Sequence, residues 1–182
     1  MARSNKTQFA ILGMLMYGPM SGYDLKKFSD KSISHFWSEN YGHIYPILKR
    51  MKTGGLVKKQ VIQTEGRPTR HAYHITAKGR SVFLEWLKVP PEREIRRNEF
   101  LLKLFFGGFL PSQALIGLIE FERRRNEMIL ENYGQLVKKS ISKLTDCGEN
   151  FANLTLSYGI KVGRARAQWC EEFLRELKKK KR

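Results

Sequence analysis

YGHIYPILKRMKTGGLVKKQVIQTEGRPTRHAYHI, residues 41–75, is the stretch that decides the fold. Residues 41–53 place apolar side chains at helical spacing, and a pair of glycines follows them, so the pattern predicts a helix with a natural C-terminal stop. Two runs rich in β-branched and aromatic residues come next, at 56–62 and 71–75. The basic turn 64–70 joins them. The stretch therefore predicts a helix followed by a β-hairpin with arginine at its tip.

Further elements extend this pattern on both sides. Residues 7–17 form an apolar helical run that Gly18-Pro19 stops, and Ser21 is placed to cap a second helix over residues 22–30. After the hairpin, Thr76 is placed to cap a fourth helix, over residues 77–87. The order helix, helix, helix, strand, strand, helix predicts a winged helix-turn-helix domain over residues 1–91.

In a winged helix-turn-helix the third helix enters the major groove of DNA, and the hairpin reaches the backbone or the minor groove. Gly66 and Pro68 favour a short, stiff turn, which holds nearby arginines ready for a narrow, strongly negative groove. Tyr45 could instead lie at the edge of the core, and His43 could simply cap or pack. The candidate DNA contacts are Tyr41, His43, Tyr45, Lys49, Lys52, Arg67, Thr69 and Arg70.

The second half, residues 92–182, has a wholly helical pattern. We expect a short helix at 99–106, a long helix from Pro111 to about Leu144, a turn at 146–150 and a last helix at 151–179. Such long helices have little core to cover them within one chain, so we expect them to pair with each other and with a second copy. A closed monomeric bundle is the alternative. The predicted inward stripe of the last helix is Leu154, Tyr158, Val162, Ala165, Trp169, Phe173 and Leu177.

Charge favours a polyanionic partner. The 182 residues carry a formal net charge of +17, and residues 1–91 hold 15 basic and 5 acidic side chains. Nucleic acid fits this excess first, and an anionic membrane surface second. No apolar run approaches the length of a membrane span, and no signal-peptide core is present, so we expect a cytoplasmic protein.

Several kinds of site are not expected. The two cysteines, Cys147 and Cys170, fit neither a zinc spacing nor a disulfide framework. We expect no metal and no cofactor. The sequence has no H-E-x-x-H motif, no P-loop and no G-x-S-x-G motif, which argues against an enzyme.

Short blocks of the first half also carry a resemblance. They are Met14-Leu15-Met16, Gly18-Pro19-Met20-Ser21-Gly22-Tyr23-Asp24-Leu25, Gly42-His43-Ile44-Tyr45-Pro46-Ile47-Leu48-Lys49-Arg50-Met51, Gly54-Gly55-Leu56-Val57, Gly66-Arg67-Pro68 and Tyr73-His74-Ile75-Thr76-Ala77-Lys78-Gly79-Arg80. In residues and spacing they resemble the PadR family of bacterial transcriptional regulators, over about residues 7–87. By length and helical pattern, the second half is similar to the larger branch of that family, whose C-terminal helices make the dimer.

The resemblance implies a homodimeric repressor that binds a palindromic operator in double-stranded DNA and is released by a small molecule. Aromatic effectors are typical of one branch. Trp86, Tyr133, Tyr158 and Trp169 are candidates for lining an effector pocket, although such aromatic residues also serve as ordinary core. The alternative function is a non-specific architectural protein, for which the same basic face would serve.

Overall fold

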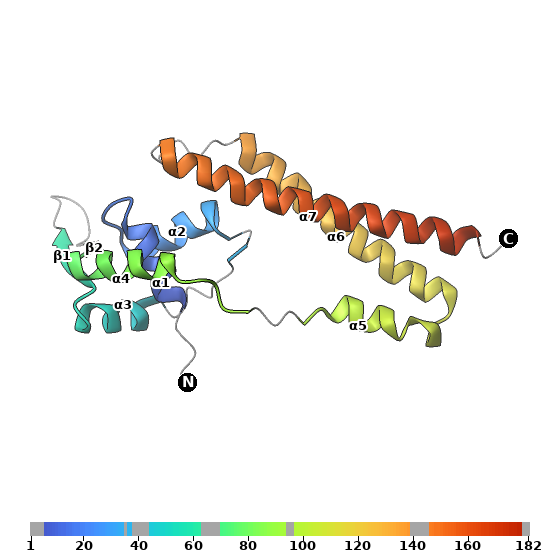
Figure 1. Ribbon diagram of the computed structural model, residues 1–182, viewed down its shortest axis with the longest axis horizontal. Coiled ribbons are helices and arrows are strands. Elements are labelled where there is room, and N and C mark those ends of the chain that lie inside the picture. The colour runs from blue at the N-terminus through green and yellow to red at the C-terminus, as the bar shows by residue number, and fades with distance from the viewer. Residues whose placement is uncertain are drawn as a thin grey trace. The chain divides into compact units, whose positions relative to one another are not determined.

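The computed structural model describes residues 6–34, 36–37, 44–62, 70–93, 97–138 and 146–179. The chain divides into two compact units, Met1–Glu92 and Arg93–Arg182 (Figure 1). The roles expected for the two halves, DNA binding and dimerisation with effector sensing, stay predictions.

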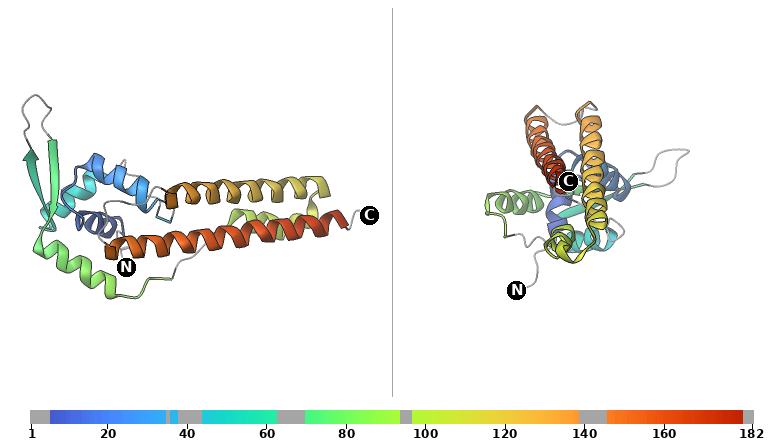
Figure 2. Two further views of the ribbon diagram at one scale, coloured as in Figure 1. Left: turned by 90° about the horizontal axis from the view of Figure 1, so that it is seen from above. Right: turned by 90° about the vertical axis from the view of Figure 1, so that its right-hand side faces the viewer.

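The first unit has the expected winged-helix order, and the prediction of a mainly helical fold with a small hairpin is confirmed. Strands β1 and β2 pair antiparallel, with Val57 opposite Ile75 and Ile62 opposite Arg70 (Figure 2). The elements are α1 (Lys6–Leu15), α2 (Gly22–Ser32), α3 (Ile44–Thr53), β1 (Val57–Ile62), β2 (Arg70–Ile75) and α4 (Ala77–Lys88).

The core of this unit is formed where the apolar faces of the first three helices meet. Ile11 and Leu12 of α1, Leu25 of α2, and Leu48 and Met51 of α3 are almost completely buried. Ser21 caps α2 as predicted, because its hydroxyl accepts a hydrogen bond from the Asp24 amide while the Asp24 carboxylate accepts one from the Ser21 amide. A fixed start for α2 sets the angle between the helices that carry the core.

The start of α4 is tied to the turn between α3 and β1. Thr76 caps α4, as its hydroxyl accepts a hydrogen bond from the Gly79 amide and donates to the carbonyl of Gly55 at 2.7 Å. Gly55 has a φ of +72°, the left-handed conformation that suits a glycine after a helix. A Cβ atom on Gly79 would lie 2.1 Å from the Leu56 carbonyl oxygen, so α4 approaches this turn more closely than any side chain would allow.

The second unit is a long antiparallel pair of helices, α6 (Ser112–Lys138) and α7 (Asp146–Lys179), preceded by α5 (Glu99–Phe105) and the short helix η2 (Gly107–Phe109) (Figure 2). The predicted turn at 146–150 is wrong, because α7 already begins at Asp146. Asp, Asn and Gly favour turns in isolation, but acidic residues are also favourable in the first turn of a helix.

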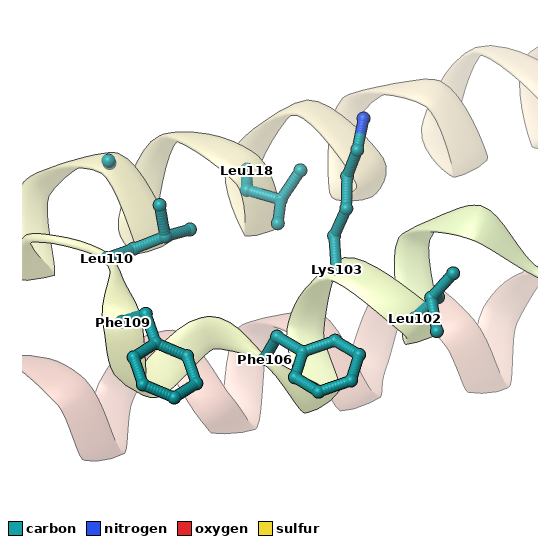
Figure 3. Close-up of a pocket in the computed structure, with 7 residues that line it drawn as sticks. Leu102, Lys103, Phe106, Phe109, Leu110 and Leu118 are labelled. Atoms are coloured by element: carbon teal, nitrogen blue, oxygen red, sulfur yellow. The ribbon is translucent and has the colours of Figure 1, made fainter.

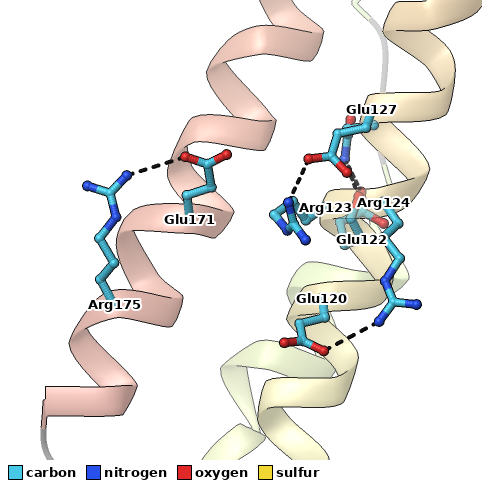
Figure 4. Close-up of polar contacts among 8 residues, drawn as sticks. Glu120, Glu122, Arg123, Arg124, Glu127, Glu171 and Arg175 are labelled. Carbon is cyan, nitrogen blue, oxygen red and sulfur yellow. Dashed lines mark hydrogen bonds and ion pairs between the residues drawn. The ribbon is translucent and has the colours of Figure 1, made fainter.

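Two glycines allow α7 to pack tightly against α6. The ring of Tyr133 lies 2.9 Å from the position that a Cβ on Gly159 would occupy, and a methyl carbon of Leu130 lies 2.9 Å from that of Gly163. Tyr133 is buried by this contact. Arginines pair with glutamates one turn away on the same helix: Arg123 with Glu127, Arg124 with Glu120, and Arg175 with Glu171 (Figure 4).

The face of α7 that contacts α6 agrees with the predicted stripe only near the C-terminal end, where Phe173 and Leu177 pack against the buried cluster that includes Ile119. Leu156, Gly163, Cys170 and Leu174 are buried, whereas Leu154, Tyr158 and Ala165 of the predicted stripe are exposed. Apolar side chains therefore lie on more than one side of α7, and in its N-terminal half the chain covers the side with Leu156 and Gly163. Periodicity alone cannot say which of two apolar faces packs.

A polar layer lies within the interface of α6 and α7. Glu122 and Asn126 are buried, and the Asn126 amide donates to the Glu122 carbonyl oxygen at 2.7 Å and to its carboxylate at 3.3 Å. Burial raises the pKa of the Cys170 thiol, the Glu122 carboxylate raises it further, and Arg123 partly opposes them. Cys170 is therefore a packed, protonated thiol with little reactivity.

Thiol reactivity gives a direct measure of this packing. In a Cys147→Ser variant, we expect Cys170 to react with a thiol reagent about a hundredfold more slowly in the native protein than in urea, because both burial and the raised pKa suppress the thiolate. A colourimetric thiol assay follows the rate. Equal rates in buffer and in urea would contradict the packing described.

Candidate nucleic-acid interface

Helix α3 presents one face to the core and one to solvent. Ile44, Ile47, Leu48 and Met51 are buried, and they recur every three or four residues. The opposite face must therefore point outward. It carries three of the predicted DNA contacts at positions i, i+4 and i+7, namely Tyr45, Lys49 and Lys52, all of which are exposed.

Tyr45 is exposed over 62% of its surface but is not free to rotate. Its ring and hydroxyl lie 2.9–3.1 Å from the position that a Cβ on Gly22 would occupy, so the ring rests on the first residue of α2. The pKa of Tyr73 is raised, first by burial and then by the neighbouring Tyr45. A tyrosine held in this way presents an aromatic edge to a ligand at low entropic cost.

The supporting role of Gly22 was not part of the sequence prediction. Its missing side chain leaves the space that Tyr45 occupies, and this contact joins two helices more than twenty residues apart in the sequence. Local pattern carries no signal for such a contact.

The hairpin joins the domain through its second strand. The amide of Met20 donates to the carbonyl of Tyr73 at 3.2 Å, and the Tyr73 amide donates to the Met20 carbonyl at 2.9 Å. These bonds bind β2 to the segment before α2. The hairpin is thus held to the same helices that position α3.

Several predicted contacts lie outside the described residues. They are Tyr41 and His43 before α3, and Arg67 and Thr69 in the turn of the hairpin. Arg70 is the first residue of β2, opposite Ile62, which places its backbone at the end of the ladder that leads into the turn.

Positive charge is concentrated on these elements. Lys49, Arg50 and Lys52 are exposed on α3, and Lys58 and Lys59 are exposed on β1. Among the ion pairs of the described residues, none neutralises these five side chains. Arg50 was absent from the predicted contacts, although its neighbour Lys49 was included. Such an unpaired basic surface attracts phosphate by charge alone.

The four candidate effector residues are not brought together. Trp86 lies on α4 of the first unit, where it stacks on Phe9 with ring centroids 4.5 Å apart. Tyr133 is buried against Gly159, and Tyr158 is exposed on α7. Trp169 stacks on Phe173. Their role in ligand binding stays a prediction.

Within the described ranges, no group of three or more His, Cys, Asp or Glu side chains is arranged to hold a metal ion. None of the helices there has the length and apolar character required to cross a membrane.

The fold and this surface define the class: a winged helix-turn-helix DNA-binding protein with a C-terminal helical region. Residues 11–85 match the model of the transcriptional regulator PadR-like family, and residues 96–178 match the model named virulence activator alpha C-term. The chain belongs to the PadR-like family of transcriptional regulators, in the branch with the C-terminal helical domain.

Relatives agree over nearly the whole chain. Bacillus subtilis PadR, a negative transcriptional regulator, is 25% identical over 177 residues, covering 94% of this chain and 97% of the relative. Its crystal structure with p-coumaric acid has a TM-score of 0.77 at 25% identity, covering 94% of this chain and 98% of that one. Its crystal structure with operator DNA shares the fold, with a TM-score of 0.84 at 24% identity and the same coverage of both chains.

A second relative comes from Bacillus cereus. The crystal structure of its PadR-like transcriptional regulator BC1756 is 28% identical, with a TM-score of 0.80. The match covers 97% of this chain and 98% of that chain. The similarity therefore extends over both units.

Proposed function

We propose that the protein is a cytoplasmic, homodimeric regulator that binds a palindromic operator and represses transcription until a small ligand, such as an aromatic compound, releases it. The observation that carries the DNA-binding part is the outward face of α3, where Tyr45, Lys49 and Lys52 are exposed together while the opposite face anchors the helix in the core. Such a face suits the major groove, with lysines on phosphates and tyrosine near base edges.

Exposed apolar side chains of the second unit support a dimer. Phe109 (Figure 3), Phe121, Phe151, Leu154 and Tyr158 are each at least 60% exposed. Large apolar side chains that a single chain leaves in water favour a protein partner. A two-fold dimer would present two α3 helices to half-sites about one turn of DNA apart.

Repression and ligand release rest on the relatives. Bacillus subtilis PadR is described as a negative regulator, and it has been crystallised with operator DNA and with p-coumaric acid. A ligand releases DNA only if it binds the free form better than the bound form. The C-terminal model is named for an activator, so a transcription assay with the purified protein must establish the sign of regulation.

Competition titration separates this proposal from a non-specific architectural role. We expect the protein to prefer DNA from upstream of its own gene over random DNA by about a thousandfold, because base contacts add to the phosphate term. Gel-shift titration at fixed salt measures both affinities. A preference of less than about tenfold would favour the architectural role.

A further inference from the structure

The ring of Tyr45 rests on the start of α2, on a residue that has no side chain. A Cβ atom on Gly22 would be 2.9 Å from Cε1 of this ring, 3.0 Å from Cζ and 3.1 Å from the hydroxyl oxygen. Non-bonded carbon atoms pack best at about 3.5–4.0 Å, so the ring and such a Cβ could not share this space. Gly22 is buried, whereas Tyr45 is 62% exposed. The ring takes its position only because residue 22 is glycine.

The backbone around Gly22 is anchored on its N-terminal side and within α2. The carboxylate of Asp24 accepts hydrogen bonds from the Ser21 amide at 2.9 Å and from the Ser21 hydroxyl at 2.7 Å. Met20 and Tyr73 of β2 exchange two backbone hydrogen bonds just before this cap. Residue 22 therefore cannot withdraw to make room for a side chain of its own. The exposed tyrosine ring is the part that can move.

Backbone conformation does not require glycine at position 22. Gly22 is the first residue of α2, and it does not share the positive φ of Gly18 and Gly55. Alanine can adopt this backbone, and it favours helix over glycine. The three atoms nearest to an added Cβ all belong to Tyr45. The feature that the position supplies is space for that ring.

We propose that Gly22 is a positioning residue for Tyr45, and that the fixed ring gives the regulator part of its discrimination between DNA sequences. A side chain that is ordered before binding loses little entropy when it contacts DNA. Contacts to base edges carry sequence information, whereas attraction between lysine and phosphate does not. The inference rests on the proposed function, in which Tyr45 lies near base edges, and deepens it by naming the residue that sets where the ring lies.

Glycine at the start of a helix could also serve DNA binding in another way. It would let a phosphate approach the N-terminus of the helix closely. A Cβ at position 22 would then obstruct the phosphate, and binding to every sequence would weaken whether or not Tyr45 is present. The ring of Tyr45 already fills the space beside Gly22, which favours the positioning role. The two roles predict different results for one substitution.

Gly22→Ala, made alone and together with Tyr45→Ala, distinguishes these roles. The operator is selected from a random DNA pool by the unaltered protein. We expect Gly22→Ala to lower operator affinity about tenfold, since the displaced ring must be ordered again on binding. Affinity for random DNA and its salt dependence should stay the same, because no charge is lost. In the Tyr45→Ala background the glycine substitution should have no further effect. Gel-shift titration over a range of salt concentrations measures all of these affinities.

Thermal stability separates positioning from folding. Gly22→Ala should melt at or above the temperature of the unaltered protein, because alanine favours helix and the ring can swing into solvent. Gly134→Ala is the matched control, since no atom lies within 4 Å of the added Cβ on α6. It should leave operator affinity unchanged. A Gly22→Ala protein that melts at a lower temperature would show that the ring does not yield, which contradicts the positioning role.

Fluorine NMR reports the position of the ring in the absence of DNA. In protein made with meta-fluorotyrosine, the signal that Tyr45→Phe removes belongs to Tyr45. We expect Gly22→Ala to shift this signal towards that of free fluorotyrosine, because the ring leaves its contact with α2. An unshifted signal would mean that the ring and the new Cβ coexist, and would overturn the positioning role.

The outcomes separate this inference from the proposed function. An unaltered protein that selects no operator from the pool overturns both. A protein that selects an operator and binds it equally well with Gly22→Ala overturns the positioning role and leaves the regulator intact. The same conclusion follows if Gly22→Ala costs as much affinity in the Tyr45→Ala background as it does alone.

Discussion

Replacement of Gly79 by alanine is expected to unfold the DNA-binding unit. The new Cβ would lie 2.1 Å from the Leu56 carbonyl oxygen and 3.0 Å from its carbonyl carbon, and neither is a flexible side chain that could move aside. This clash is relieved only if α4 moves away from the turn after α3, which breaks the hydrogen bond from the Thr76 hydroxyl to the Gly55 carbonyl. We expect a loss of about 3 kcal/mol or more in the free energy of unfolding. Urea unfolding followed by circular dichroism measures it.

A matched substitution isolates the steric effect. Gly134 lies in the exposed part of α6 with no atom within 4 Å of an added Cβ. Gly134→Ala should therefore be neutral or stabilising by up to about 1 kcal/mol, as alanine favours helix. In the Gly79→Ala variant, we expect backbone amides of residues 1–92 to lose protection against hydrogen exchange, while those of the second unit keep it. Unchanged protection of residues 1–92 would show that α4 and the turn do not pack as described.

The combined substitution Tyr45→Ala, Lys49→Ala is expected to weaken operator binding by about a hundredfold, since it removes both a base-edge contact and a phosphate contact. The slope of log affinity against log salt should fall by about one, because one fewer counterion is released. Gel-shift titration over a range of salt concentrations measures both. The core residues of α3 are untouched, so the melting temperature should change little.

The control removes a positive charge from elsewhere in the unit. Lys88 lies at the end of α4 and pairs with Glu85 at 2.7 Å. Lys88→Ala should leave the affinity and the salt slope close to those of the unaltered protein. Arg67→Ala, in the turn of the hairpin, should reduce operator affinity as the α3 variant does. Operator affinity unchanged by the α3 substitutions would remove this helix from the interface.

Much of the first unit could be predicted because its signals are local. Ser21 and Thr76 are cap residues just before helical patterns, and both caps form. The buried residues of α3 have a single period, so its outward face followed directly. Tyr45, Lys49 and Lys52 were placed on that face from spacing alone. The structure shows all three side chains exposed, as this placement requires. Their contact with DNA stays a prediction.

The second unit was less predictable for two physical reasons. Residues 146–150 have turn-forming composition but lie in α7, where helical hydrogen bonding outweighs weak local propensity. In α7, apolar residues lie on more than one face, and the predicted stripe is exposed at Leu154 and Tyr158 but packed at Phe173 and Leu177. Propensity and periodicity describe one helix at a time. They cannot select between two faces that both suit burial.

By itself the sequence determined the order of the winged helix, its caps and the basic, aromatic face of α3, since these depend on residues within a few positions of one another. Tertiary structure decided the contacts between distant elements. It set the ring of Tyr45 on Gly22, the backbone of α4 against Leu56, and one face of α7 against α6. Close approach depends on the shapes of both partners, and the second partner is not encoded next to the first.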